Sequence, residues 1–471
     1  MSESAWVRPQ LTVLATEQKE QVHRYSLRLL AEVGLRVDSE RARQVFSTGK
    51  AVKVSGDRVA ILPDAIDRAL ETAPHRIDVY NRHGEHAFRL GDGPARFGIG
   101  VTNLYYQEPA DEMLTPFGRA HMAAGTRLGE VLPAYDCVST LGILQDIAPG
   151  TEDVIGVLEM AANTVKPLVL LISDEGQFVP ALDLLAELCG ELAARPFAIP
   201  YLNPVTPLII NRETGDKLIA AVERGLPVIY SNYSLAGATT PITPAGMLAL
   251  LNAELLAGLV LSQLVRPGAP VILGSLPAFF DMKAMLDFYD PQTVLLNAAC
   301  AEMMAYYGIP HAGTSGSGLG SAADLPSAGL HWLNHLTACI GQTGLAPFVG
   351  GSLNSKAFSP TAVVLANDII LQARAFAAGF ALDDASAALD EIAVAGPGGS
   401  FLGARSTRKR FRDAYYTSSV FPRLSMEKWA DLGRPQAAER LKAYTLDLIA
   451  SARPPADHDD IVARGEAYLH R

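Results

Sequence analysis

Aromatic and small polar residues follow several short apolar runs of this sequence, and their types suit ligand binding. They are Asn103, Tyr105, Tyr106, Asn203, Tyr233, Phe279, Phe280 and His311, with Asp324 beyond a glycine- and serine-rich stretch that starts at Thr314. Few cations stand among them. Aromatic ring faces attract quaternary ammonium groups by roughly 0.5–2 kcal/mol per contact. A site lined in this way therefore suits a small cationic or amphiphilic ligand, and its glycine-rich opening would also admit a bulky planar cofactor.

Several of these residues also have a purely structural interpretation. The pairs Tyr105–Tyr106 and Phe279–Phe280 could pack strand ends against helices. Asp324 lies two residues before a proline, which is a good start for a helix, so its carboxylate could be a cap. His331 and His335 would share one helix face and could bind a metal, but no carboxylate motif accompanies them, and ordinary packing is the simpler interpretation.

Familiar catalytic motifs are absent from the sequence. It contains no HExxH, no GxSxG and no paired-carboxylate motif. The segment Gly396–Ser400 is rich in glycine, but no P-loop lysine follows it. The basic run at 405–412 is either a solvated face or a docking site for an acidic partner protein. We therefore expect chemistry that depends on binding and orientation, with no metal bound directly.

The elements that must position these residues recur with a regular rhythm from residue 96 onward. Short β-branched and aromatic runs end in Gly, Ser, Asn or Pro and alternate with long apolar helical segments. The runs are 96–102, 134–139, 167–172, 197–203, 227–233, 270–275, 310–315 and 347–352. Eight strand–helix units are typical of a (β/α)8 TIM barrel, in which the residues after each strand line the mouth. An open doubly wound sheet is the alternative, although no GxGxxG follows the first strand.

The two ends of the chain have a different pattern. We expect an N-terminal α+β elaboration over 1–95, with hairpins around Gly56–Asp57 and Arg82–Glu85. The barrel would span 96–380, and a C-terminal helical cap 381–471.

Composition narrows the class of protein further. Hydrophobic residues make up 49% of the 471 residues, which allows a large core, and the net charge of −11 argues against nucleic-acid binding. The four cysteines are widely spaced, and the first residues have no apolar signal region. The longest apolar stretch, 245–265, is interrupted by polar residues, which favours a buried helix over a membrane span. We expect a cytoplasmic enzyme that forms homo-oligomers.

Several longer stretches resemble a known family, the trimethylamine methyltransferase (MttB-like) superfamily, which includes glycine betaine methyltransferases. They are LRLLAEVGLRV near the N-terminus, NPVTPL at 203–208, AGATTPITPAG at 236–246, RPGAPVILGS at 266–275, AACAEMMAYYGIPHAGTSG at 298–316 and SFLGARSTRKRFR at 400–412. The resemblance covers nearly the whole chain, and it is the order and spacing of the stretches that make it specific.

The resemblance implies a TIM barrel that moves a methyl group from a methylated amine to the Co(I) of a corrinoid (cobalamin) carried by a cognate corrinoid protein. Relatives that use trimethylamine carry pyrrolysine after the seventh strand, whereas residues 314–324 here contain neither pyrrolysine nor lysine. The chain thus resembles the non-pyrrolysine branch, and a quaternary amine such as glycine betaine fits better, because its leaving amine needs no proton.

In this interpretation the nine residues named first take specific roles. The cage for the cation would be formed by Tyr105, Tyr106, Tyr233, Phe279 and Phe280. Asn103, Asn203, His311 and Asp324 would orient the substrate through polar contacts, and His311 and Asp324 are the candidate catalytic residues. Two alternatives stay open: a family member that binds a betaine-like ligand without turning it over, and another small-molecule barrel enzyme such as a lyase.

Overall fold

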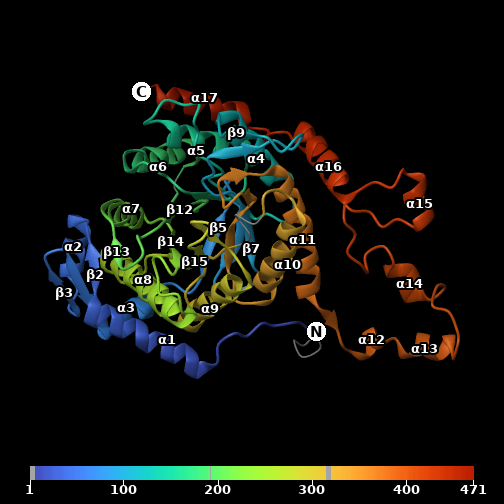
Figure 1. Cartoon of the computed structure of the whole chain (residues 1–471), viewed down its shortest axis with the longest axis horizontal. Coiled ribbons are helices and arrows are strands. Elements are labelled where there is room, and N and C mark those ends of the chain that lie inside the picture. The colour runs from blue at the N-terminus through green and yellow to red at the C-terminus, as the bar shows by residue number, and fades with distance from the viewer. Residues whose placement is uncertain (1–5, 191, 315–319, 471) are drawn as a thin grey trace.

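The computed structural model describes residues 6–190, 192–314 and 320–470, and a curled sheet of parallel strands lies at its centre (Figure 1). The strands are β7 (Arg96–Ile99), β10 (Cys137–Ser139), β11 (Leu168–Leu170), β12 (Ala198–Leu202), β14 (Val228–Ala236), β15 (Val271–Asp281) and β17 (Leu345–Val349). Their order is β15-β14-β12-β11-β10-β7-β17, and each neighbouring pair is parallel. An eighth strand, β16 (Leu286–Phe288), pairs antiparallel with β15.

The segment 310–313 lies between the two outermost parallel strands. Leu273 of β15 forms a parallel bridge with His311, and Ala312 forms one with Leu345 of β17. Backbone hydrogen bonds support both contacts, from Leu273 N to Pro310 O at 3.0 Å and from Gly313 N to Leu345 O at 2.9 Å. The seventh predicted strand therefore contacts each of its two neighbours through one isolated β-bridge.

Helices follow the strands and surround the sheet. They are α4 (Arg119–Val131), α5 (Glu152–Asn163), α6 (Glu175–Cys189), α7 (Arg212–Glu223), α8 (Pro244–Val265), α9 (Pro291–Tyr307), α10 (Leu325–Ile340) and α11 (Pro360–Ala378). Proline in the first turn starts α8, α9, α10 and α11. Among the described helices, α8 and α11 are long and apolar enough to cross a membrane by length and composition. Burial of α8 between the sheet and the N-terminal helices explains its apolar character.

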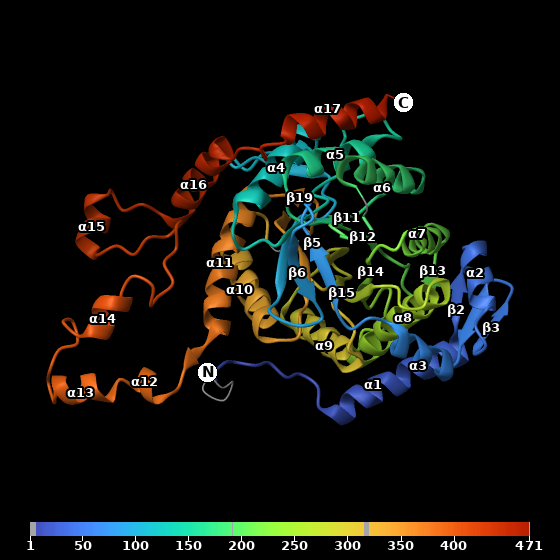
Figure 2. The same ribbon diagram turned by 180° about the vertical axis from the view of Figure 1, so that it is seen from behind.

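A hairpin closes the end of the sheet at which the strands begin. It consists of β5 (Ile77–Tyr80) and β6 (His86–Leu90), and Figure 2 shows it in front of the curled sheet. Its apolar residues, such as Val79 and Phe88, pack in one cluster with Cys137, Val169 and Ile229, each the first or second residue of its strand. The opposite end, where the strands finish, is therefore left for a site.

The other N-terminal elements pack against the outside of the helices that surround the sheet. They are β1 (Trp6–Val7), α1 (Thr16–Arg28), the π-helix η2 (Leu29–Val33), β2 (Leu35–Val37), α2 (Glu40–Ser47), β3 (Val52–Ser55), β4 (Arg58–Ile61) and α3 (Pro63–Thr72). Helices α1 and α3 lie on α8, and β13 (Ile209–Ile210) extends the small sheet through β2. The Ser39 hydroxyl caps α2 by accepting from Ala42 N at 2.9 Å.

The C-terminal part of the chain consists of packed helices and a projecting segment. Helices α16 (Ala437–Ser451) and α17 (His458–Leu469) pack on the helices around the sheet, α16 on α11 and α17 on α5. Between β20 (Phe380–Ala381), which pairs with β1, and α16, the chain projects away from the sheet and its helices (Figure 1). The residues of that segment are therefore largely exposed.

The C-terminal cap is tied to the hairpin by one bidentate ion pair. Arg82 donates from Nη1 and Nη2 to the two carboxylate oxygens of Asp457, both at 2.7 Å. The Arg82 side chain is 3% exposed and that of Asp457 36%. Hydrogen bonding to Arg82 lowers the pKa of Asp457 to about 2. Removal of the carboxylate would leave a buried guanidinium without its counter-charge.

We expect Asp457→Asn to lower the free energy of unfolding at pH 7 by about 1–2 kcal/mol, since water screens part of the pair. The pKa of Asp457 is lower in the folded protein than in the unfolded chain, where it is near 4. The carboxylate therefore makes its full contribution to the free energy of unfolding above pH 4, and this contribution is lost as the pH falls through about 2. The difference between wild type and variant should therefore hold from pH 7 to 5 and shrink below pH 4 in urea unfolding. The exposed Asp460→Asn on the same helix is the control, and equal losses from both substitutions would contradict the prediction.

Candidate active site

Two aromatic rings meet inside the sheet near the ends of β12 and β17. Tyr201 and Phe348 are buried and pack edge to face, with centroids 4.8 Å apart. Tyr201 and Ile199 belong to the same interior cluster, as expected for residues two positions apart on one strand. Both side chains therefore face the inside of the sheet. Burial raises the pKa of Tyr201 to about 12, and the neighbouring side chains of Ser231 and Asn203 offset only a smaller part of this effect. The phenol therefore stays neutral, with its hydroxyl close to Ser231 and Asn203.

The carboxylate of Asp287, a residue of β16, lies near this aromatic pair at the end of the sheet. The Tyr233 hydroxyl donates to Oδ2 of Asp287 at 2.7 Å. Tyr289 is close to both, and its phenol is also near Tyr201. Burial raises the pKa of Tyr233 and Tyr289, and the negative charge of Asp287 adds to both shifts. At neutral pH the site therefore presents neutral phenols, ring faces and one carboxylate.

Asp287 forms no ion pair with a basic residue in the described part of the chain. The stretch 315–319, which lies outside the described residues, contains no Lys, Arg or His either. The Asp287 side chain is partly exposed, so water can solvate its charge in place of a cationic partner. A ligand with a positive charge would supply that partner, and the surrounding rings would add cation–π attraction.

Hydrogen bonds join several segments of the chain near this cluster. Asn354 donates to the backbone oxygen of Asp287 at 2.7 Å. The Ser352 hydroxyl donates to Gln107 at 3.0 Å, and Gln107 donates to Ser321 O at 3.0 Å. Residues 353–355 all have positive φ, from 52° to 59°, a conformation that non-glycine residues adopt at a cost and that is common at functional sites.

The structure brings three of the nine predicted residues to this cluster. Asn203 donates to Ser231 O at 2.8 Å, and Tyr233 binds Asp287 directly. Phe280 lies opposite Asp287 in the β15–β16 ladder, so both side chains face the same way as Tyr233. Phe279 faces the other side, where its ring stacks on Phe288 with centroids 5.8 Å apart.

The prediction that Phe279 and Phe280 follow the sixth strand is wrong, because β15 continues to Asp281 through its pairing with β14 and β16. Tyr105 and Tyr106 do follow the first strand, β7, as predicted, but they form a further short strand. They belong to β8 (Tyr105–Gln107), which pairs with β9 (Leu114–Pro116) and, together with β18 (Gly351–Ser352) and β19 (Ala357–Phe358), forms a small sheet. Tyr106 stacks on His121 at 4.2 Å, so its ring is used in packing.

Asn103, His311 and Asp324 take part in structural contacts, and none of the three bonds directly to the aromatic cluster in the described residues. The Asn103 amide donates to Leu141 O at 2.7 Å and also to Val101 O, joining two strand ends. Asp324 caps α10 by accepting from Ser327 N at 2.8 Å. His311 lies next to Asn297 of α9, since a Cβ at Gly313 would contact both side chains. It is thus on the helix side of its segment, where burial lowers its pKa to about 3.

Four residues of the cluster were missed from the sequence: Tyr201, Asp287, Tyr289 and Phe348. Tyr201 and Phe348 lie within predicted strands, where a period of two separates inward from outward side chains, and that alternation was the available signal. Asp287 and Tyr289 belong to LDFYDP, which precedes a helix and gives no separate signal of a strand.

The histidines of α10 contact each other. His331 Nδ1 lies 3.1 Å from His335 Nε2. Burial lowers the pKa of His331 to about 4 and that of His335 well below its usual value, so both rings are neutral. Within the described residues no group of three His, Cys, Asp or Glu side chains could hold a metal.

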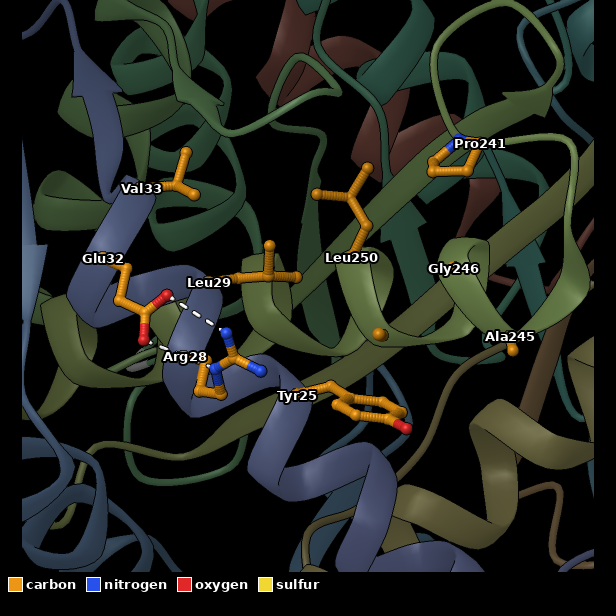
Figure 3. A pocket seen from close by; sticks show the side chains of 10 residues that line it. Tyr25, Arg28, Leu29, Glu32, Val33, Pro241, Ala245, Gly246 and Leu250 are labelled. Carbon is orange, nitrogen blue, oxygen red and sulfur yellow. Dashed lines mark hydrogen bonds and ion pairs between the residues drawn. The ribbon is translucent and has the colours of Figure 1, made fainter.

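A separate hollow of about 390 Å³ lies between the N-terminal helices and the start of α8. Figure 3 shows Tyr25, Leu29 and Leu250 around it, with the Arg28–Glu32 ion pair at one side. The lining is apolar and the hollow is remote from Asp287, since it lies on the outer face of α8. We assign no ligand to it.

Comparison with known proteins gives a consistent result over the full chain. The family described as "Trimethylamine methyltransferase (MTTB)" matches residues 5–471. The glycine betaine methyltransferase of Desulfitobacterium hafniense (strain Y51) is 26% identical over 470 residues, which cover 98% of this chain and 97% of the relative. The trimethylamine methyltransferase MttB of D. hafniense (strain DSM 10664 / DCB-2) is 25% identical, covering 96% and 92%.

A solved structure agrees with the fold. The monomethylamine methyltransferase MtmB of Methanosarcina barkeri superposes with a TM-score of 0.51 at 10% sequence identity, covering 93% of this chain and 89% of that chain. At such low identity the similarity concerns the fold alone.

Proposed function

This chain belongs to the trimethylamine methyltransferase (MTTB) family and is a methyltransferase, and on that premise we propose that its methyl donor is a quaternary amine of the glycine betaine type. The observation that carries the proposal is the unpaired carboxylate of Asp287 between tyrosine side chains. The acceptor in this proposal is the Co(I) of a corrinoid held by a partner protein, and the reaction takes place in the cytoplasm, in keeping with four free cysteines.

The proposal includes a closed (β/α)8 barrel. The single bridges of His311 and Ala312 to β15 and β17 support closure, since they fill the gap between the two outermost parallel strands. The β5–β6 hairpin then plugs one end of the ring, and the aromatic cluster lies at the other. A TIM barrel carries its active site at that second end.

The residues around the mouth fit a bulky group presented by a partner. Ile242, Met282, Met285 and Leu325 follow strand ends and are highly exposed. Such an apolar rim suits the face of a macrocycle, and the corrinoid would supply a strongly nucleophilic cobalt as methyl acceptor. The chain itself contributes orientation: rings and Asp287 hold the cation, so that one N–CH₃ bond faces the opening.

Charge considerations explain why no general acid is required. Transfer of the methyl group leaves a neutral tertiary amine, so no proton has to reach the nitrogen. The phenols of Tyr201 and Tyr233 remain protonated and orient polar atoms of the substrate. His311, which is neutral and buried on the helix side, contributes to packing in this proposal.

The test uses purified enzyme, a cognate corrinoid protein with reduced cobalt, and a panel of methylated amines. A visible-spectrum change that depends on glycine betaine or another quaternary amine is the expected result. Transfer only from trimethylamine, or calorimetric binding of the amine without any spectral change, would contradict the proposal.

Two adjacent phenylalanines provide a matched pair of variants. Phe280→Ala should weaken calorimetric binding of the quaternary amine by about five-fold, because its side chain shares a face with Asp287. Phe279→Ala should leave affinity within two-fold but lower stability by about 1–2 kcal/mol, because it loses packing against Phe288. A reversed pattern would show that β15 has the opposite register.

A further inference from the structure

Residues 382–435 form an arm that stands away from the barrel. It contains α12 (Asp384–Ala387), α13 (Leu389–Ala395), α14 (Arg405–Arg410) and α15 (Met426–Asp431), and none of these helices has a buried residue. Val420 alone in the arm is buried. Figures 1 and 2 show the arm beyond α11, with open space around its helices.

The arm carries a large amount of exposed apolar surface. Eleven large apolar side chains are 38–89% exposed: Leu382, Leu389, Ile392, Val394, Phe401, Leu402, Phe411, Tyr415, Met426, Trp429 and Leu432. Together they expose an area on the order of 1,000 Å², spread over the four short helices of the arm and the segments between them. This is enough to supply the roughly 800 Å² that each partner buries in a stable protein–protein interface.

The arm is held in place at three points, so it cannot fold back freely to cover this surface. It starts at β20, which pairs with β1, and it ends at α16, which packs on α11. In between, the Tyr416 and Ser418 hydroxyls both donate to Oδ1 of Asp368 on α11 at 2.6 Å. Its apolar side chains therefore stay available to another molecule.

We propose that the arm packs on a second copy of this chain, and that the second copy's arm packs on the first. A two-fold dimer needs the same chain to provide both the arm and a surface to receive it. The side wall next to the arm is such a surface, because Trp332 of α10, Phe376 of α11 and Phe380 of β20 are exposed there. Apolar interfaces of this kind are typical of obligate homodimers.

The charge of the arm also favours a second copy of this chain as its partner. The segment 405–412 has five cations and no acidic residue, in a chain whose net charge is −11. Within the described residues these five cations form no ion pair. An acidic second copy complements them, and it is present at equal concentration.

The test compares sedimentation equilibrium of the full-length wild type with that of a double variant, Val394→Asp with Leu402→Asp. We expect a wild-type dimer, or a multiple of one, at micromolar concentration, and a dissociation constant at least ten-fold higher in the variant. Val33→Asp, at an exposed valine outside the arm, is the control and should dissociate like the wild type. Circular dichroism of each protein checks folding.

A second measurement needs no variant. Equal amounts of light and heavy-isotope wild type are mixed, treated with a carbodiimide and digested. Cross-links that join arm residues Lys409 or Lys428 of one isotope to barrel carboxylates of the other are expected. A monomeric wild type, a dimer unaffected by the folded double variant, or arm cross-links within single copies only would each overturn the proposal.

Discussion

Asp287→Asn is expected to raise the KM for a quaternary amine by about ten-fold or more, with a smaller change in kcat. Coulomb attraction between unit charges about 5 Å apart, at an effective dielectric constant near 20, amounts to about 3 kcal/mol before ligand desolvation is subtracted. Asparagine keeps the shape and can still accept from the Tyr233 hydroxyl, so the variant removes charge with little else. The substrate loses its charge during transfer, so the carboxylate acts mainly on the bound ground state.

A neighbouring carboxylate provides the control for this variant. Asp281 lies in the same β15–β16 hairpin opposite Leu286, one position along from the Phe280–Asp287 pair and therefore on the other face. Asp281→Asn should leave KM within two-fold. Titration calorimetry with glycine betaine would report the affinity of both variants without requiring the corrinoid protein. If Asp287→Asn binds as well as wild type, the cation is held elsewhere.

The strand–helix rhythm was predictable because each strand has clear chemical boundaries. Pro167 precedes the apolar run at 168–170 and Pro204 follows the run at 198–202, and the observed strands β11 and β12 lie within the predicted ranges. The hairpins around Gly56 and Arg82–Glu85 were also confirmed, since turn residues flanked by alternating side chains specify them. Local patterns of this kind do not depend on distant parts of the chain.

The site was harder to predict because it depends on long-range pairing. β15 runs to Asp281 only because β16 adds an antiparallel partner there, and this pairing alone brings Asp287 to Tyr233. Likewise, the inward or outward direction of His311 is set by its register with Leu273. A shift of one residue reverses the face of every side chain, so correct strand boundaries were not sufficient.

The C-terminal arm shows a different limit of sequence patterns. Its helices have apolar residues that suggested packing on the rest of the chain, and within one copy these residues are exposed. Sequence patterns report that a face needs to be covered, but they do not say which molecule covers it.

Gly274→Ala is expected to destabilise the protein by about 3 kcal/mol or more, the largest effect of any single methyl group considered. A Cβ at Gly274 would lie 1.5 Å from the carbonyl oxygen of Ala312 and 2.6 Å from its carbonyl carbon. Both are backbone atoms, so no side-chain rotation can relieve the overlap. The strand would have to separate from 310–313, which costs the hydrogen bonds of Leu273 with Pro310 O and Ala312 N.

This variant tests whether the sheet closes, because Gly274 lies at the bridge that fills the gap between β15 and β17. Gly329→Ala on α10 adds the same methyl group where no atom lies within 4 Å, and helix propensity predicts a gain of up to about 1 kcal/mol. Soluble yield and apparent Tm at one scan rate would compare the two. If Gly274→Ala unfolds within a degree of wild type, segment 310–313 does not approach β15 as described, and the closed barrel loses its support.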